Sequence, residues 1–405
     1  MGLLKTITEE YLGVLEYSKE IKRNFSIPGN VSDIVALTGP RRAGKTYTVL
    51  KEVQSILNSG GSTIYASFDD PSFLSMNERK FAELVRQEYP RGIVTLFLDE
   101  IQEWKNWDYK VRWLHDVKDF RIVITGSSSS LLSSEIPSRL RGRYITRRLL
   151  PLSFADIYGR NKDQSFRDLG ILRNNLEEYL KWGGFPEVCL QKSREKLVSI
   201  QETMFYRDIM ERHGVKDMTL FRDFFNHVLS NYSNQFTWNS LKRLMEPIGI
   251  KIDTKTVMSY VENICSSYLT YLNTRFSYSE KQSGNSPKKL YLVDPGLVSI
   301  NSRNSDIGRK IENIVYLQLL RMDGIINYYT NKEGKEIDFL FSGSTEKVLI
   351  EVCTEVDPDH RTKVKKALRE IGGSRALIIF LDGIERNEDS IQEISLLKWL
   401  NNPTI

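Results

Sequence analysis

The sequence predicts an α/β protein of several domains, and three observations support this. A loop with two glycines stands between an apolar strand and a helical pattern within residues 33–57. A second buried-looking strand ends in two acids at positions 99 and 100, and short apolar strands alternate with helices after residue 304. A strand, such a loop and a helix in that order are typical of the first unit of a parallel sheet.

The chain of 405 residues has room for two to four domains. We place a phosphate-loop domain at 1–150, a helical region at 151–218, three helices with a hairpin at 219–303, and a second α/β domain at 304–405. The boundaries follow the changes in periodicity along the sequence.

The composition is that of a globular protein, with 40% hydrophobic and 27% charged residues. The formal charge is 57 − 52 = +5, which permits an acidic partner without requiring one. The three cysteines, Cys189, Cys265 and Cys353, form no CxxC pair and are typical of a reducing compartment. The first residues form an amphipathic pattern and not a signal peptide, and the apolar run at 376–381 is too short to span a bilayer. We therefore expect a soluble cytoplasmic protein with no membrane partner.

The loop at 39–46 fits the pattern GxxxxGK[ST] through Gly39, Gly44, Lys45 and Thr46. Glycines let backbone N–H groups surround phosphate oxygens, and the N-terminus of the following helix favours negative charge. Lys45 is expected to reach the β- and γ-phosphates, and the Thr46 hydroxyl to bind magnesium. The alternative is a plain loop, which the flanking strand and helix disfavour. The predicted cofactors are ATP and Mg, with the nucleotide bound by Gly39, Pro40, Arg41, Arg42, Ala43, Gly44, Lys45, Thr46 and Tyr47.

The strand at 93–98 ends in Asp99 and Glu100. An acid at the tip of a strand beside a phosphate loop can hold magnesium through water, and the next acid can orient or deprotonate the attacking water. Strands often end in solvated acids, so this pair indicates a catalytic site only because a phosphate loop precedes it in the sequence. We predict Asp99 as a metal ligand and Glu100 as a catalytic residue.

A third strand, at 121–126, precedes a run of serines, and three arginines follow at 139, 141 and 143. Ser127 or Ser128 could contact the γ-phosphate or cap a helix. An arginine beside the γ-phosphate, from this chain or a neighbour, would stabilise the transition state. We name Ser127 and Arg143 as catalytic candidates, although Arg139 and Arg141 are equally possible and a basic surface is the alternative.

The motifs "TGPRRAGKT", "LFLDEIQ", "ITGSSSSLL", "LRGR" with "PLSFADIY", and "YLKWGGFPEV" resemble an AAA+-related family of ATPases common in archaea and also found in bacteria. The resemblance extends over nearly the whole chain. It implies an ATP-binding fold with a helical lid at 151–218, followed by a winged helix and a C-terminal nuclease-like domain. It also implies that Pro186 approaches the adenine, whereas the bare sequence allows a simple helix terminator.

The region 219–303 has the element order of a winged helix. Such a fold often binds DNA, and Lys251, Lys255, Lys281, Lys288 and Lys289 stand at suitable positions for phosphate contacts. The same fold also serves in protein contacts or as a spacer. The predicted partners are therefore a nucleotide and duplex or branched DNA, with a homo-oligomer as a further possibility.

The tail, at 304–405, resembles the PD-(D/E)XK nuclease superfamily. The resemblance implies a magnesium site made by Asp338, Glu351 and, on the preceding helix, Glu312. The family's lysine falls at position 353, where this chain has cysteine; a substitute could come from Lys335, Lys363, Lys365 or Lys366. Metal-dependent cleavage, an inactive remnant and plain acid-ended strands all stay open.

Two functions follow. The first is an ATPase that couples hydrolysis to DNA binding or remodelling, with possible cleavage by the tail. The second is a nucleotide-controlled switch for protein interactions, in which the nuclease-like tail is inactive.

Overall fold

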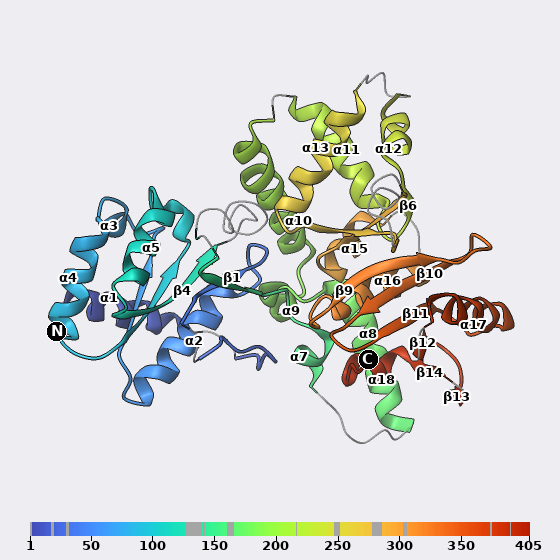
Figure 1. Cartoon of the computed structure of the whole chain (residues 1–405), viewed down its shortest axis with the longest axis horizontal. Helices are drawn as coiled ribbons and strands as arrows, with labels where there is room; N and C mark the ends of the chain where they lie inside the picture. Colours follow the sequence, from blue (N-terminus) through green and yellow to red (C-terminus); the bar gives the residue numbers. More distant parts are fainter. Residues whose placement is uncertain are drawn as a thin grey trace. The chain divides into compact units, whose positions relative to one another are not determined.

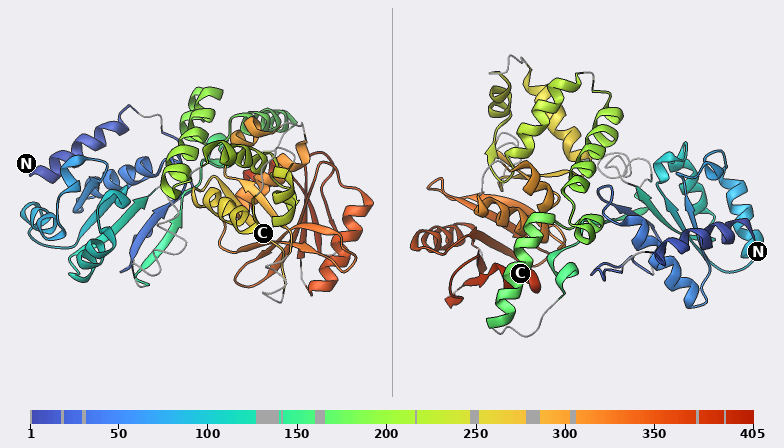
Figure 2. Two further views of the ribbon diagram at one scale, coloured as in Figure 1. Left: turned by 90° about the horizontal axis from the view of Figure 1, so that it is seen from above. Right: turned by 180° about the vertical axis from the view of Figure 1, so that it is seen from behind.

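The computed structural model describes residues 2–17, 20–29, 32–126, 140, 142–159, 166–215, 217–246, 252–277, 286–302, 306–372, 375–388 and 390–405. The chain divides into two compact units, Met1–Leu150 and Pro151–Ile405. Their elements are labelled in Figure 1 and drawn from two further sides in Figure 2. The second unit combines the three regions that follow residue 150 in the sequence.

The first unit is built on a five-stranded sheet in the order β2-β3-β4-β1-β5. All four strand pairs are parallel, as in the P-loop AAA+ fold, so the prediction of a parallel α/β sheet is confirmed. The strands are β1 (Ile34–Thr38), β2 (Thr63–Ser67), β3 (Val94–Asp99), β4 (Phe120–Gly126) and β5 (Tyr144–Arg148). The helices are α1 (Leu3–Leu12), α2 (Lys45–Asn58), α3 (Pro71–Leu74), α4 (Glu78–Glu88) and α5 (Trp107–Asp116), with 3₁₀ turns η1 (Gly13–Leu15) and η2 (Ile101–Glu103).

Both faces of this sheet are buried, because alternate residues of each strand point to opposite sides. On one face, Ile34, Leu96 and Ile122 pack with residues of α1, α4 and α5. On the other face, Val35 and Phe97 pack with α2. The strands therefore read as continuous apolar runs, and polar residues at their ends mark the functional edge.

The helical part of the second unit begins at Pro151. It contains α7 (Phe154–Tyr158), α8 (Phe166–Trp182), α9 (Pro186–Gln191), α10 (Arg194–Thr203) and the π-helical segment η4 (Met204–Glu211). A three-stranded sheet of order β6-β8-β7 follows, with antiparallel pairs. Its elements are α11 (Met218–Ser230), β6 (Gln235–Phe236), α12 (Trp238–Met245), α13 (Thr254–Ser266), β7 (Thr270–Thr274), β8 (Lys288–Leu292) and α15 (Pro295–Asn301).

The tail contains a six-stranded mixed sheet of order β13-β14-β12-β11-β10-β9. Strands β9, β10 and β11 are antiparallel neighbours, whereas β12 lies parallel to both β11 and β14. The elements are α16 (Ile307–Leu319), β9 (Ile325–Thr330), β10 (Glu336–Ser342), β11 (Lys347–Cys353), α17 (Pro358–Ile371), β12 (Arg375–Phe380), β13 (Arg386–Glu388), β14 (Ile391–Ser395) and α18 (Leu396–Asn401). The sequence predicted this order as far as β12 and the final helix, but it missed β13 and β14, which are short and charged.

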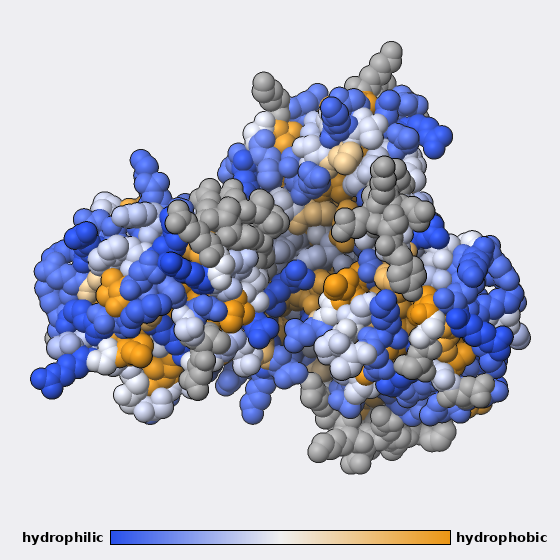
Figure 3. All heavy atoms as spheres, in the orientation of Figure 1, coloured by the Kyte–Doolittle hydropathy of each residue, from blue (hydrophilic) through white to orange (hydrophobic). Residues whose placement is uncertain are grey.

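Two surface properties bear on function. Within the described ranges, no helix is long and apolar enough to cross a membrane. On the face drawn in Figure 3, hydrophilic residues cover most of the described surface and hydrophobic residues form separate small patches.

Candidate functional site

The phosphate loop lies at the carboxyl end of β1 and leads directly into α2. Gly39 has φ +147°, and a Cβ atom there would lie 2.0 Å from the carbonyl oxygen of Leu149. Gly44 has φ 92° and immediately precedes Lys45, the first residue of α2. Only glycine fits both positions easily. The two glycines let the loop pass close to Leu149 and turn into α2, where backbone N–H groups at a helix N-terminus can surround an anion.

Lys45 is 5% exposed, and its ammonium folds back over the loop. The Nζ atom donates hydrogen bonds to the carbonyl oxygens of Gly39 and Pro40, each at 3.0 Å. Carbonyl groups solvate an ammonium without neutralising it. The glycine cradle and the lysine therefore fit a nucleoside triphosphate.

Asp99, at the end of β3, is 2% exposed and is surrounded by hydroxyl groups. Its Oδ2 accepts hydrogen bonds from Thr46 Oγ1 and Tyr65 Oη, both at 2.7 Å. Its Oδ1 accepts one from Thr125 Oγ1. Hydroxyls hold a carboxylate in place but leave its negative charge uncompensated. The pairing of Asp99 with Thr46 fits a magnesium site beside the phosphates.

Glu100 has an unusual backbone conformation, with φ 48° and ψ 47°. Its N–H donates to Thr125 Oγ1 at 3.1 Å, and its Oε2 accepts from Gln102 Nε2 at 2.5 Å. The left-handed conformation is uncommon for a residue other than glycine and indicates a constrained position.

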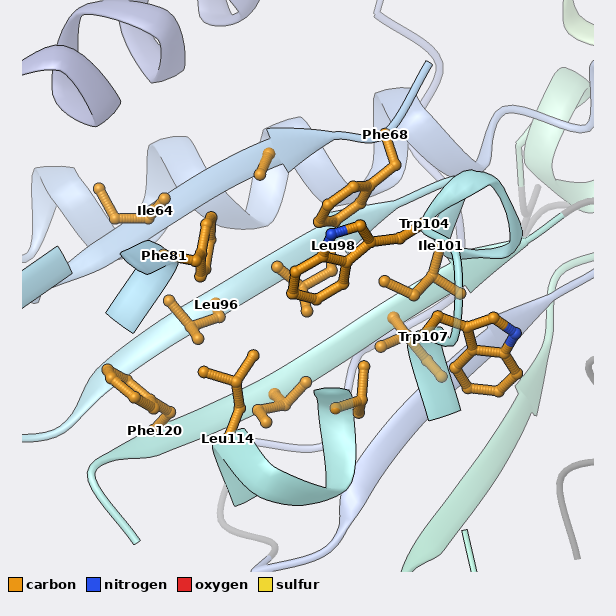
Figure 4. Packing of buried hydrophobic residues seen from close by; sticks show 14 of the residues in the cluster. Ile64, Phe68, Phe81, Leu96, Leu98, Ile101, Trp104, Trp107, Leu114 and Phe120 are labelled. Carbon is orange, nitrogen blue, oxygen red and sulfur yellow. The ribbon is translucent and has the colours of Figure 1, made fainter. Parts of the chain in front are cut away.

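The turn after Glu100 is fixed by two buried apolar side chains, Ile101 and Trp104. The Trp104 ring stacks on Phe68 with centroids 4.5 Å apart, and its Nε1 donates to the carbonyl of Met76 at 2.8 Å. Figure 4 shows these rings packed over the sheet residues. The core therefore fixes the turn that carries Glu100. Because the Trp104 ring is both stacked and hydrogen-bonded, this turn has little freedom to move.

Three residues beside the loop were not predicted as site residues. Tyr65 and Thr125 hold Asp99, and Arg23 donates to the carbonyls of Ala43 at 2.7 Å and Leu150 at 2.9 Å. Thr125 had a detectable signal, because it is polar near the end of an apolar strand. Burial first, and then the nearby Asp99, raise the pKa of Tyr65 far above its ordinary value, so the phenol stays a neutral donor.

The edge of the sheet beside the loop is acidic. Burial, followed by repulsion from Glu100, Glu103 and Asp99, raises the pKa of Asp69, while Arg41 opposes the shift. Clustered carboxylates of this kind favour a cation between them. This charge distribution is consistent with a magnesium–nucleotide complex as the ligand.

Other predicted residues lie elsewhere. Arg143 precedes β5 at the amino end of the sheet, where its carbonyl accepts from Ile34 N at 3.1 Å, and its guanidinium pairs with Asp116 of α5 at 2.5 Å. Because β1 separates that edge from the phosphate loop, Arg143 cannot reach the loop of its own chain. Ser127, Ser128, Arg139 and Arg141 lie outside the described residues.

Pro186 is the first residue of α9, in the second unit. Just before this helix, the backbone N–H of Gly184 donates a hydrogen bond to the buried Asp294 carboxylate at 2.6 Å. This bond fixes the start of α9. The adenine contact implied for Pro186 stays a prediction.

In the tail, the predicted acids Glu312 and Asp338 lie near each other, around a lysine. Lys289 of β8 is 3% exposed, and its Nζ lies 2.7 Å from Glu312 Oε1, 2.5 Å from Glu336 Oε1 and 3.4 Å from Asp338 Oδ1. Asp338 Oδ2 accepts from Val352 N at 2.9 Å. These carboxylate oxygens contact an ammonium group in the arrangement where the resemblance implied a metal.

Glu351, the third predicted acid, is paired with another lysine. Lys363 Nζ of α17 lies 2.5 Å from Glu351 Oε1. Burial, then repulsion from Asp338, raise the pKa of Glu351 well above its ordinary value, while Lys363 lowers it. Burial raises the pKa of the Cys353 thiol to about 12, so Cys353 is neutral and cannot supply the charge of the family's lysine. Lys363, whose ammonium contacts Glu351, is thus the best substitute for the family's lysine among the described residues.

Two corrections follow for the DNA contacts. Lys288 and Lys289 are both buried, and the predicted phosphate contacts are therefore wrong for them. Lys251 and Lys281 lie outside the described residues, so Lys255 of α13 is the predicted lysine that still stands in a described segment. Across the described ranges, no group of three or more His, Cys, Asp or Glu side chains is arranged to hold a metal ion.

The parallel sheet and the glycine loop that leads into α2 are those of a P-loop AAA+ fold. In agreement, residues 31–158 match the family described as "AAA domain", and residues 173–306 match a "Domain of unknown function (DUF8612)". The chain belongs to the family of "Uncharacterized protein MJ1544" of Methanocaldococcus jannaschii, to which it is 31% identical over 379 residues, covering 90% of this chain and 84% of that protein.

Two further similarities were found. An "Uncharacterized protein" of Haemophilus influenzae is 26% identical over 381 residues, covering 91% of this chain and 94% of that protein. Among solved structures, the Walker-type ATPase of Pyrococcus abyssi aligns with TM-score 0.42 and 16% identity, over 72% of this chain and 95% of that one. At that TM-score, nothing about activity follows for this chain.

Proposed function

We propose that this protein hydrolyses ATP, with magnesium, at the phosphate loop. The observation that carries the proposal is Asp99, a buried carboxylate held by three neutral hydroxyls. One of these hydroxyls belongs to Thr46, the residue that follows Lys45 of the phosphate loop. The hydroxyls orient the Asp99 carboxylate without cancelling its negative charge, and the Lys45 ammonium lies over the glycine loop. This arrangement suits a ligand that brings both a cation and an anion.

Each residue of the site has a distinct part in the proposed reaction. Lys45 binds the β- and γ-phosphates once its ammonium leaves the Gly39 and Pro40 carbonyls. Thr46 and Asp99 would hold magnesium, which neutralises charge on the phosphates when bound. Glu100 orients the attacking water and accepts its proton. Tyr65 and Thr125 act as positioning residues for Asp99.

The proposal includes an arginine supplied by a second copy of the chain. Arg143 stands at the sheet edge opposite the phosphate loop, so it can serve only a neighbour's site. In a homo-oligomer, that arginine, or Arg139 or Arg141 beside it in sequence, would stabilise charge on the transferred phosphoryl group. Hydrolysis should then increase more than linearly with protein concentration.

We further infer that the ATPase cycle is coupled to DNA. The order α11-β6-α12-α13-β7-β8 supports a winged helix, and Lys255 lies in the first turn of its third helix. ATP turnover measured with and without duplex or branched DNA tests this coupling. Turnover that is unchanged by DNA at low salt, where phosphate contacts are strongest, would contradict it.

A second candidate is a nucleotide-controlled protein switch with an inactive nuclease-like tail. It is favoured by the pairing of Glu312, Asp338 and Glu351 with Lys289 and Lys363, which leaves these acids without the open oxygen set of a cutting site. This candidate predicts slow ATP turnover that DNA does not change. It also predicts that self-association or partner binding depends on whether nucleotide is bound.

The test of the ATPase is Lys45→Ala. We expect turnover to fall by about 100-fold or more, because both phosphate binding and charge stabilisation are lost. The control is Lys51→Ala on the same helix, whose ammonium lies 3.7 Å from Glu20 at the surface, and it should keep full activity. Chelation of magnesium with EDTA should stop the wild type. Equal turnover by the Lys45 variant and the wild type would overturn the proposal.

A further inference from the structure

The carboxylate cluster of the tail contains its own cation. Lys289 comes from β8 of the three-stranded sheet, Glu312 from α16, and Glu336 and Asp338 from β10 of the six-stranded sheet. One side chain from the middle region therefore enters a site whose acids belong to the tail. The three carboxylates would repel one another strongly in the absence of a cation.

The geometry around Lys289 is saturated. An ammonium has three N–H donors, and three carboxylate oxygens lie at 2.5, 2.7 and 3.4 Å from its Nζ atom. The neighbouring groups add further hydrogen bonds. Tyr291 Oη donates to Glu312 Oε1 at 2.7 Å, and Val352 N donates to Asp338 Oδ2 at 2.9 Å. Gln235 Nε2 donates to Glu336 Oε2. Each of these acids is thus held by protein groups.

A divalent metal cannot occupy the same place as Lys289. Magnesium requires oxygen ligands at about 2.0–2.1 Å in octahedral geometry, and the Lys289 ammonium already lies between the oxygens that would supply them. The acids and the implied metal therefore do not fit together in this arrangement.

The remaining charge is also reduced by burial. With every group ionised, four acids (Glu312, Glu336, Asp338, Glu351) and two lysines (Lys289, Lys363) would sum to 2 − 4 = −2. Burial raises the pKa of Glu312 to about 7 and that of Glu351 well above its ordinary value. A proton on Glu312 would bring the net charge of the cluster to −2 + 1 = −1, while Glu351 stays paired with Lys363. Glu351 Oε2 is buried without a hydrogen-bond partner among the described residues, and one such oxygen does not make a metal site.

We propose that the Lys289 ammonium is the permanent cation of this cluster, fastening the three-stranded sheet to the tail and excluding divalent metal from Asp338. The cluster then links β8 to β10 by ion pairs, and the tail does not cut nucleic acid by a metal-dependent route. This inference is independent of the ATPase, because its test uses protein without nucleotide.

The test compares divalent-metal binding by Lys289→Met and the wild type. Full-length, nucleotide-free protein is titrated with MnCl₂, at ionic strength matched with NaCl because salt screens charges. Bound Mn²⁺ is counted by its electron paramagnetic resonance signal, and the thermal unfolding midpoint is followed in parallel. Ligand that binds only the folded state raises the midpoint with concentration.

Lys288→Met is the matched control. Lys288 is also buried on β8, but its Nζ donates to the Ser286 carbonyl at 3.0 Å and lies 4.9 Å from the Trp238 ring centroid. It should behave as the wild type toward Mn²⁺. The double variant Lys289→Met/Asp338→Asn shows whether any new metal is bound by the tail acids.

We expect the wild type and Lys288→Met to bind no Mn²⁺ at the tail. Lys289→Met should have a lower midpoint without metal, bind one Mn²⁺ and regain several degrees as Mn²⁺ is added, and lose both effects with Asp338→Asn. A wild-type Mn²⁺ site that Asp338→Asn removes would overturn the proposal, as would a folded Lys289→Met that binds none. Should Lys289→Met not fold, Lys289→Met/Glu312→Gln removes one repelling acid and carries the same test.

Discussion

Asp99 and Asp338 are both aspartates on strands of an α/β sheet, and both have their carboxylate oxygens engaged, but by different groups. The partners of Asp99 are hydroxyls of Thr46, Tyr65 and Thr125. Those of Asp338 are the Lys289 ammonium and a backbone amide. Hydroxyls orient a negative charge without cancelling it, whereas an ammonium cancels it. The first site can therefore take a cation from solution, and the second holds one that belongs to the chain.

The comparison also shows why an acid motif alone does not identify a metal site. Both sites have acids at positions that their motifs require, and both acids have little exposure, with Asp99 2% exposed and the Asp338 side chain 13% exposed. What separates them is the charge of the groups that surround the acids. A buried carboxylate with neutral partners is costly unless a cation arrives, so it is the better candidate for a ligand site.

The largest expected effect is on ATP turnover, and it is tested by making the same glutamate-to-glutamine change at each of the two sites. Glu100→Gln should lower ATP turnover by about 10² to 10⁴-fold, the usual contribution of a general base, while nucleotide binding is retained. Glu351→Gln, in the tail, should leave turnover per folded molecule within about twofold. Steady-state phosphate release and binding of a fluorescent ATP analogue measure the two quantities. Equal losses in both variants would mean that the tail acids take part in the ATPase reaction.

The second effect concerns stability. Lys363→Met leaves Glu351 buried without its cation, which should cost about 3 kcal/mol in the free energy of unfolding at pH 8. On the same helix, Lys366 pairs with Glu333 at the surface, 2.7 Å apart with both side chains nearly half exposed. Lys366→Met should therefore cost less than about 0.5 kcal/mol. Urea unfolding of the two variants measures the difference.

The loss in Lys363→Met should depend on pH, and the sign follows from Glu351. Burial raises the pKa of Glu351 in the folded state, and without Lys363 it rises further. The folded variant then keeps the Glu351 proton to a higher pH than the folded wild type does, so its free energy of unfolding falls more than that of the wild type as pH rises above about 4.5. The variant should thus be closest to the wild type near pH 5 and furthest from it near pH 8. A loss that is constant across this range would show that the Glu351 carboxylate does not need a cation.

The phosphate loop and Asp99 could be predicted because their signals are local. Gly39, Gly44 and Lys45 lie within seven consecutive positions of the sequence, and the strand ending in Asp99 is a short apolar run. Their chemistry requires particular residue types at fixed spacing, which a single sequence displays directly.

The surroundings of the acids could not be predicted in the same way. Tyr65 reaches Asp99 from the neighbouring strand β2, 34 residues earlier in the chain. Lys289 reaches Asp338 over 49 residues, between two different sheets. Lysines in a hairpin suggest a basic surface unless the strand is known to be buried. The acids of the tail were therefore found, but the cation beside them was assigned to DNA.

The smallest effect tests how much one neutral hydroxyl contributes to the Asp99 site. Tyr65→Phe removes a single hydrogen bond at 2.7 Å and leaves Thr46 and Thr125 in contact with the carboxylate. We expect about 1 kcal/mol less free energy of unfolding and a rise of a few-fold in the magnesium concentration needed for half-maximal turnover. Tyr89→Phe, which removes a longer bond of 3.4 Å to the Thr63 carbonyl, serves as the control and should leave the magnesium requirement unchanged. If Tyr65→Phe also left the magnesium requirement unchanged, the phenol would only stabilise the fold. A lowered magnesium requirement would instead mean that the phenol competes with the metal for Asp99. A neutral hydroxyl would then oppose metal binding, as we infer for the Lys289 ammonium in the tail.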